Sequence, residues 1–175
     1  MDAVSRSQNT DSPTVTVAAV VAAALGLASA ALSAYWAAGG TALLNTIGGA
    51  IAEWGRHGGP GVRFALWLIV LLKVGVGVAA PAIADLPRIS PAWTRTRVPR
   101  LLSWIAASIL IAYGAVLTGS ELIAFTGMLG TPPSVDRLAL AWHAFVWDPW
   151  FLLWGVAFLV CLVRTRPSAV ASTRP

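Results

Sequence analysis

Long runs of apolar residues dominate the chain, and short polar segments separate them. Four runs occur, at 15–38, at 62–84, from Leu101 toward Leu117 or beyond, and from about Ala144 to Val163. Helices of this length, rising about 1.5 Å per residue, approach or exceed the roughly 30 Å hydrocarbon core of a bilayer. A backbone in hydrocarbon must satisfy its own hydrogen bonds, so all four runs are expected to be helical. The pattern predicts an all-α, integral membrane four-helix bundle.

Composition supports a membrane protein with one domain. Of the 175 residues, 57% are hydrophobic and 11% are charged, whereas ordinary soluble domains are about 45–50% apolar and about 25% charged. We expect a disordered cytoplasmic tail at 1–14, a single transmembrane domain at 15–163 and a second cytoplasmic tail at 164–175.

Small residues recur at every fourth position of the first run. They are Ala18, Ala22, Gly26, Ala30, Ala34 and Ala38. In lipid, helices associate through close packing, which such a stripe permits. The first helix is therefore expected to be a packed one.

Arginines are concentrated in alternate connections. With both termini inside, eight lie on the inner side (Arg6, Arg88, Arg95, Arg97, Arg100, Arg164, Arg166 and Arg174) and three on the outer side (Arg56, Arg63 and Arg137). The positive-inside rule then predicts a multi-pass protein of the cell inner membrane with both termini in the cytoplasm.

The two outer connections each contain a helical pattern. In residues 39–61, bounded by glycine pairs, Leu44, Ile47, Ile51 and Trp54 recur at steps of three and four. This spacing predicts one short amphipathic helix against the outer mouth of the bundle. In residues 118–143, a turn at "GTPPS" precedes a pattern that begins at Val135 and continues toward the fourth run.

The stretch "WHAFVWDPWFLLWG" at 142–155 allows two interpretations. Asp148 as N-cap and Pro149 as first helical residue would start a helix, but one too short to cross comfortably. A continuous helix kinked at Pro149 fits the length better. It places four side chains on one face, which is either an interfacial aromatic belt or part of a site: His143, Trp147, Trp150 and Trp154.

Lys73 falls near the middle of the second run. A lysine at that depth is costly, so it should face the bundle interior or extend toward a partner. A functional and a structural role both remain open, because no acidic residue occupies the same depth in the other runs.

Three carboxylates from separate regions converge on the outer side in this topology: Glu53, Glu121 and Asp148. Polar residues expected nearby are His57, His143, Arg56 and Asn45. This convergence is the best indication of a site. Two histidines and a single cysteine are too few for a dedicated metal centre, so we expect no metal and no cofactor.

The segments "AYWAAGG" (34–40), "NTIGG" (45–49) and "WHAFVWDPWFLLWG" make the chain resemble an uncharacterised family of small bacterial four-helix membrane proteins. The resemblance covers nearly the whole chain outside the tails, and the third segment, with its WDPWFLLWG core, is more specific than the YWxxGG part. The family label implies no activity by itself.

More weakly, the layout is similar to small membrane-bound terpene cyclases of meroterpenoid pathways, in which acidic residues at helix ends protonate a prenyl chain and remove the final proton. By order along the chain, the resemblance maps these roles to Glu53 and Asp148. Tryptophan faces stabilise cations, and Trp36, Trp54, Trp147 and Trp150 are expected to line the cavity. Asp148 is the expected proton donor, whereas Glu53 should stay ionised beside Arg56.

Three classes of function stay open from the sequence. The first is an intramembrane enzyme on an isoprenoid-type substrate, with a terpene cyclase as the best specification. The second is a non-enzymatic accessory or lipid-binding or partner-binding membrane protein, and the third is a small proton-coupled transporter. The expected partners are membrane lipid and a lipophilic prenylated small molecule, with a homo-oligomer left open. The arginines bracket apolar runs, so no nucleic acid is expected.

Overall fold

The computed structural model describes residues 12–86, 96–127 and 136–165, and helices account for nearly all of these residues. The long helices are α2 (Pro13–Ala37), α5 (Pro60–Ile83), α6 (Arg97–Thr126) and a continuous stretch formed by α7 (Arg137–Trp142), the π-helical segment η2 (His143–Trp147) and α8 (Asp148–Arg164). The short helices α3 (Leu44–Ile47) and α4 (Gly49–His57) lie between α2 and α5. Four helices are long and apolar enough to cross a membrane. The predicted all-α membrane fold is confirmed.

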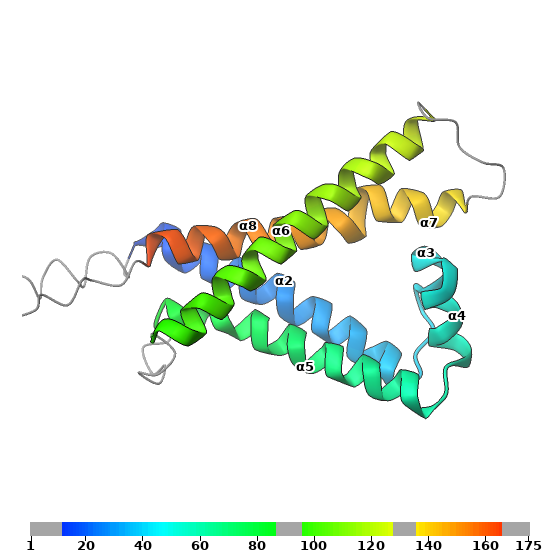
Figure 1. Ribbon diagram of the computed structural model, residues 1–175, viewed down its shortest axis with the longest axis horizontal. Coiled ribbons are helices and arrows are strands. Elements are labelled where there is room, and N and C mark those ends of the chain that lie inside the picture. The colour runs from blue at the N-terminus through cyan, green and yellow to red at the C-terminus, as the bar shows by residue number, and fades with distance from the viewer. Residues whose placement is uncertain (1–11, 87–95, 128–135, 166–175) are drawn as a thin grey trace, which may run out of the picture.

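The four long helices cross the molecule in alternate directions (Figure 1). The start of α2, the end of α5, the start of α6 and the end of α8 lie at one end of the molecule, here called the termini end. The short helices α3 and α4 lie at the opposite end, here called the α3 end. This arrangement is expected of a chain that crosses a membrane four times. Which end faces the cytoplasm stays a prediction from the arginines.

The small-residue stripe of α2 allows close packing against two other helices. Ala18, Ala22 and Gly26 are buried where α2 packs against α5 and α8. A Cβ atom on Gly26 would lie 2.6 Å from the Trp154 ring and 2.7 Å from the Gly77 Cα atom. No side chain fits there, so glycine at position 26 allows three helices to meet.

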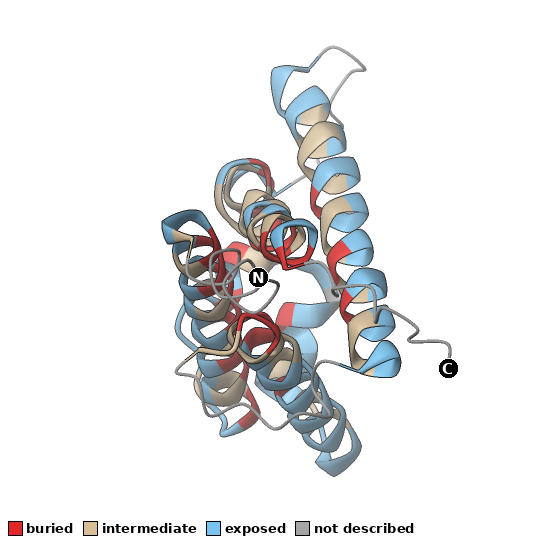
Figure 2. Ribbon diagram, turned by 90° about the vertical axis from the view of Figure 1, so that its left-hand side faces the viewer, coloured by how far each residue is buried: buried red, intermediate tan, exposed pale blue. Residues whose placement is uncertain are grey.

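Glycines also permit the close crossing of α6 and α8. A Cβ atom on Gly114 would collide with the backbone of Leu152, and one on Gly155 would lie 2.8 Å from the Ile111 amide nitrogen. Buried residues occupy the helix sides that face one another, while exposed residues cover the outside of the bundle (Figure 2). Because those outer side chains are mostly apolar, they suit a lipid environment.

The first outer connection differs from the single amphipathic helix predicted for it. Gly48 has a φ of +66° and separates α3 from α4, so the helical periodicity does not continue across it. Leu44 is buried on α3, but Ile51 and Trp54 on α4 are exposed. The four apolar residues of the pattern therefore do not share one buried face.

The last membrane helix is continuous through Asp148 and Pro149, as the length argument predicted. Asp148 has helical backbone angles (φ −79°, ψ −41°), and its N–H donates to the His143 carbonyl five residues earlier. The widened π turn lies directly before Pro149, which has no N–H to donate. The alternative role of Asp148 as N-cap is wrong. Asp136 caps this helix instead, with Oδ1 accepting from the Leu138 and Ala139 amides.

The third helix extends well beyond the apolar run that predicted it. It begins at Arg97 and ends at Thr126, where Gly127 adopts a left-handed conformation with a φ of +74°. The "GTPPS" turn and much of the arginine-rich connection lie outside the described residues, as do most of the two predicted tails.

Candidate functional site: a buried histidine–aspartate pair

The π turn brings His143 and Asp148 together. In an ordinary α-helix, residues five apart point about 140° away from each other. The wider turn of η2 removes most of that angle, and His143 Nδ1 lies 3.2 Å from Asp148 Oδ2 and 3.4 Å from Oδ1. Single π turns inside α-helices are rare and often occur at functional sites.

The two members of the pair differ in burial. The Asp148 side chain is 1% exposed, while the His143 side chain is 27% exposed. A buried carboxyl group is costly unless it is hydrogen-bonded, and the histidine supplies the bond. His143 is therefore the member that a ligand can reach, and Asp148 lies behind it.

Hydrogen bonding assigns the protons of the imidazole ring. His143 Nε2 lies 3.1 Å from the Ile47 carbonyl oxygen. A carbonyl oxygen only accepts, so Nε2 carries a hydrogen. Nδ1 then either donates to an ionised Asp148 or accepts from a protonated one. In both forms the pair holds one shared proton between Nδ1 and the carboxyl group.

Three tryptophan rings form a cluster on the segments that carry and position the pair. Trp147 Nε1 lies 3.2 Å from Thr46 Oγ1, which ties η2 to α3. The Trp147 ring packs edge-on against Trp36, at 6.1 Å between centroids, and lies 5.7 Å from Trp142. Trp36 and Trp147, two of the predicted lining residues, thus lie together, and Trp147 bonds to Thr46, next to the Ile47 carbonyl that His143 contacts.

Trp150 has a different neighbourhood from Trp36 and Trp147. Its Nε1 atom donates to the Leu25 carbonyl of α2 at 3.0 Å, deeper in the bundle. Trp154, one turn further along α8, is fully buried against Gly26. His143, Trp147, Trp150 and Trp154 thus all reach toward α2 or α3, and the two deepest are too far inside for an interfacial belt.

The expected approach of Glu53 to Asp148 does not occur. The Glu53 side chain is 64% exposed and lies 3.1 Å from Arg56 Nη1 and 3.3 Å from His57 Nδ1, both on α4. Trp54, the fourth predicted lining residue, is 59% exposed. The break at Gly48 and the partners within α4 explain why these side chains stay outside the site.

The other predicted polar residues lie apart from the pair. Asn45 is exposed on α3, and Glu121 is half-buried on α6. Within the described ranges, neither is hydrogen-bonded to His143 or Asp148. No group of three histidine, cysteine, aspartate or glutamate side chains in these ranges could hold a metal ion.

Two groups of α3 that position the site were not identified from the sequence. Thr46 and the carbonyl of Ile47 fix the orientations of Trp147 and His143 from another segment of the chain. The "NTIGG" segment contains both residues, but every residue has a main-chain carbonyl, so the residue type does not show which carbonyl forms a contact. Only the packing of α3 against α7 and η2 reveals it.

Lys73 points into the bundle, as its depth requires. Its Nζ atom lies 2.9 Å from Ser33 Oγ on α2 and 5.4 Å from the centroid of the Phe151 ring on α8. The hydroxyl accepts one hydrogen bond, and the ring adds a cation–π contact. Neither partner carries a negative charge.

Comparison with known proteins gives a family and no activity. Neither the curated proteins nor the solved structures contain a match, so the resemblance to terpene cyclases gains no support. A family model matches residues 26–158, well over half of the chain, from the packing glycine of α2 to a buried phenylalanine of α8. The chain belongs to the family described as "Protein of unknown function (DUF3995)".

Proposed function

We propose that the protein is an integral membrane enzyme that carries out acid–base chemistry on a lipophilic substrate, with His143 and Asp148 as the proton-holding pair. The observation that carries this proposal is the buried Asp148 carboxyl group held against His143 by a π turn. Such a pair keeps one proton in a water-poor environment beside a partly accessible imidazole. In this proposal His143 and Asp148 have the acid and base roles that were expected of Glu53 and Asp148 from the sequence.

The geometry suggests how the proton would be used. In the ionised form of the pair, Nε2–H of the imidazolium gives its proton to a substrate oxygen that replaces the Ile47 carbonyl. The imidazole stays neutral with its Nδ1–H directed at the Asp148 carboxylate. Nε2 then recovers a proton from the rearranged substrate cation, so the pair returns to its starting state. Gly48 follows Ile47 directly and supplies the backbone freedom to release its carbonyl.

An isoprenoid cyclisation is the best specification of this chemistry. Opening an epoxide consumes one proton, and loss of a proton from the final carbocation returns it. The clustered rings of Trp36, Trp142 and Trp147, two of which come from the same helix as His143, would offer electron-rich faces to a cation. A prenylated substrate would already be concentrated in the bilayer around the four helices. In this proposal the enzyme resides in the cell inner membrane with both termini in the cytoplasm.

The test compares two histidine–carboxylate pairs in the same chain. Membranes that contain the protein are incubated with prenylated and epoxidised-prenyl aromatic substrates, and cyclic products are measured. Asp148→Asn should lower the rate about 10²–10⁴-fold, because a neutral amide can hydrogen-bond to Nδ1 but cannot stabilise the imidazolium that donates the proton from Nε2. Glu53→Gln, the matched control, should retain the wild-type rate.

Two outcomes would contradict the proposal. If Asp148→Asn keeps the full rate, the pair is not the acid–base group, even when the wild type makes product. If the wild type makes nothing from any of these substrates, the enzyme specification fails. Thermal unfolding of each variant separates loss of chemistry from loss of fold.

An accessory role is the second candidate, and a specific observation favours it. His143 and Trp147 both hydrogen-bond to α3, so the site also acts as a clamp that holds α3 on the bundle. A lipid-binding or partner-binding protein needs this clamp but no proton transfer. In that case His143→Gln and Asp148→Asn would alter stability and partner binding without affecting any turnover.

A further inference from the structure

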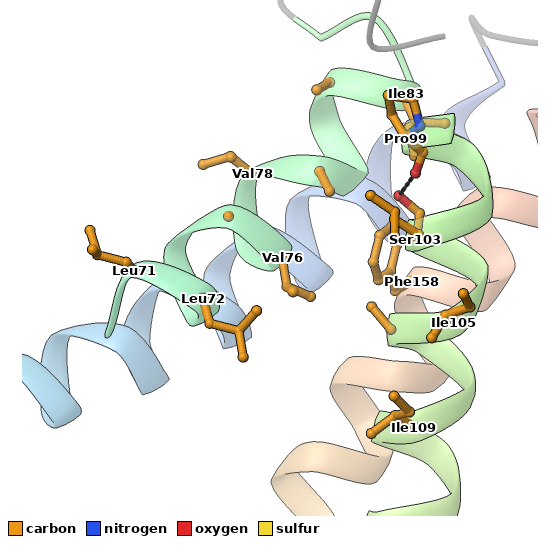
Figure 3. Close-up of a pocket in the computed structure, with 15 residues that line it drawn as sticks. Leu71, Leu72, Val76, Val78, Ile83, Pro99, Ser103, Ile105, Ile109 and Phe158 are labelled. Carbon is orange, nitrogen blue, oxygen red and sulfur yellow. Dashed lines mark hydrogen bonds between the residues drawn. The ribbon is translucent and has the colours of Figure 1, made fainter. Parts of the chain in front are cut away.

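A second feature, remote from the α3 end, is an apolar cleft between α5 and α6 (Figure 3). It has a volume of about 740 Å³, and Phe158 of α8 contributes to its wall. Ser103 is the one side chain with a hydroxyl among the lining residues, and its Oγ donates to the Pro99 carbonyl at 2.8 Å. The lining therefore offers hydrocarbon surface to an occupant.

The cleft is a wedge that lies along the membrane-spanning direction. Ile83 and Pro99 lie close together at its narrow end, while Leu72 and Ile109 face each other across a wider gap (Figure 3). The lining on α5 extends from Leu71 to Ile83, which is about 18 Å at 1.5 Å per residue. The narrow end is the termini end, and the wide end opens near the middle of the bundle.

Two polar side chains that are not themselves lining residues lie near the level of the wide end. Lys73 lies one turn from Val76 on α5, and Tyr113 lies one turn from Ile109 on α6, both toward the α3 end. Phe151 of α8 joins them, because its ring lies 5.4 Å from Lys73 Nζ and 5.3 Å from the Tyr113 ring. One ring of α8 thus connects the Lys73 ammonium group to the Tyr113 ring, at the level of Leu72 and one turn beyond Ile109, where the cleft is wide.

Lys73 lacks an anionic partner in the described part of the chain. It is the only lysine in the sequence, and its one hydrogen bond there goes to Ser33 Oγ. An ammonium group has three donors, so two remain for a ligand. Because a cation at this depth is costly without a counter-charge, the site is complementary to an anion that arrives with a hydrocarbon chain.

We propose that the cleft binds a single-chain lipid with a carboxylate head group, that is, a long-chain fatty acid. The tail lies between α5 and α6, and the carboxylate pairs with Lys73 Nζ. One positive charge matches a monoanion, whereas the phosphate monoester of a single-chain alkyl phosphate carries about −1.5 to −2 charges and would leave a buried excess. The volume falls within the roughly 300–1,000 Å³ typical of small-molecule sites. This site is independent of the chemistry proposed for His143 and Asp148.

The experiment uses the single lysine as the reporter. Purified full-length protein in detergent micelles is treated with an amine-reactive label, with a long-chain fatty acid, the alcohol of equal chain length or the corresponding alkyl phosphate present. Mass spectrometry separates the Lys73 peptide from the N-terminal amine. The acid should protect Lys73 at a concentration at least tenfold lower than the alcohol or the phosphate requires.

Direct binding of a fluorescent polyene fatty acid tests the role of the charge. Lys73→Met should weaken binding at least tenfold and abolish the preference for the acid over the alcohol. Lys73→Arg keeps the charge and should keep the preference. Arg63→Met removes an exposed positive charge from the same helix and should bind as the wild type does.

Filling the cleft tests the place of the tail. Ala106→Phe puts a ring among the lining residues and should weaken binding of acid and alcohol alike at least tenfold, whereas Val116→Phe, on the exposed side of α6, should not. The proposal is overturned if Lys73→Met keeps the acid preference, if the phosphate binds more tightly than the acid, or if neither acid nor alcohol binds. It is also overturned if Ala106→Phe converts a dimer to a monomer, since a second copy would then occupy the cleft.

Discussion

Two histidine–carboxylate pairs lie toward the α3 end of the protein, and they differ in burial rather than in distance. His57 Nδ1 lies 3.3 Å from Glu53 Oε2, and His143 Nδ1 lies 3.2 Å from Asp148 Oδ2. The first pair has side chains that are 76% and 64% exposed, against 27% and 1% for the second. Similar contacts thus occur in two very different environments.

The local geometry of the two pairs explains the difference. Glu53 and His57 are four residues apart on α4, so an ordinary helical turn makes them neighbours. His143 and Asp148 are five residues apart, and they meet only because η2 widens the helix and α3 holds the imidazole. The exposed pair depends on its own helix alone, whereas the buried pair depends on three segments. Substitutions that affect the two pairs unequally therefore test this interpretation.

Replacing the histidine should produce the largest contrast. His143→Leu leaves the carboxyl group of Asp148 buried without its partner, and breaking a buried pair in this way costs about 3–5 kcal/mol. His57→Leu should change the free energy of unfolding by less than about 0.5 kcal/mol, because both groups face the outside. Thermal or denaturant unfolding in micelles measures both. Equal losses in the two variants would show that burial does not distinguish the pairs.

Replacing the carboxylate should produce a smaller contrast. Asp148→Ala leaves Nδ1 of the partly accessible His143 without a partner, so the loss should be about 1–3 kcal/mol. Glu53→Ala should cost less than about 1 kcal/mol, as exposed ion pairs do. The same unfolding measurements apply. A loss for Asp148→Ala that exceeds that for His143→Leu would contradict the assignment of Asp148 as the more buried partner.

The bond between Trp147 and α3 should contribute less than either member of the buried pair. Trp147→Phe keeps the ring contact with Trp36 but removes the N–H bond to Thr46, at a cost of about 0.5–1.5 kcal/mol. Amide hydrogen exchange should become faster in Leu44–Ile47. Trp54→Phe, on exposed α4, is the control and should leave exchange in α3 unchanged. Unaltered exchange in the Trp147 variant would show that this bond does not hold α3.

Salt should produce the smallest effect, and only at the exposed pair. The screening length falls from about 10 Å at 0.1 M salt to about 3 Å at 1 M. The stability difference between wild type and Glu53→Gln, below about 1 kcal/mol at low salt, should therefore vanish at 1 M sodium chloride. The difference between wild type and Asp148→Asn should stay constant. A salt-dependent difference at Asp148 would mean that water and ions reach the buried carboxyl group.

Much of the fold could be predicted from local sequence. The four apolar runs predicted the membrane helices because hydrocarbon leaves a backbone few alternatives. The stripe around Gly26 predicted a closely packed first helix, and the length of the last run predicted a helix that continues through Pro149. The depth of Lys73 predicted an inward side chain for the same reason of cost. Each of these inferences depends on one segment and on the solvent that surrounds it.

The partners of the polar groups were decided by the tertiary structure. Convergence was expected of Glu53, Glu121 and Asp148. Instead, the break at Gly48 keeps Glu53 on an exposed helix, and the π turn places Asp148 within hydrogen-bond distance of His143. The pattern of side chains along the sequence predicts neither the contact of the Ile47 carbonyl with His143 nor the α5–α6 cleft. Hydrophobic burial is summed over many residues, so a prediction based on it tolerates a shift of one or two positions. A hydrogen bond requires two particular atoms within about 3 Å, so it cannot be predicted in the same way. The chain's periodicity therefore determined its helices, and only the crossing of those helices determined its site.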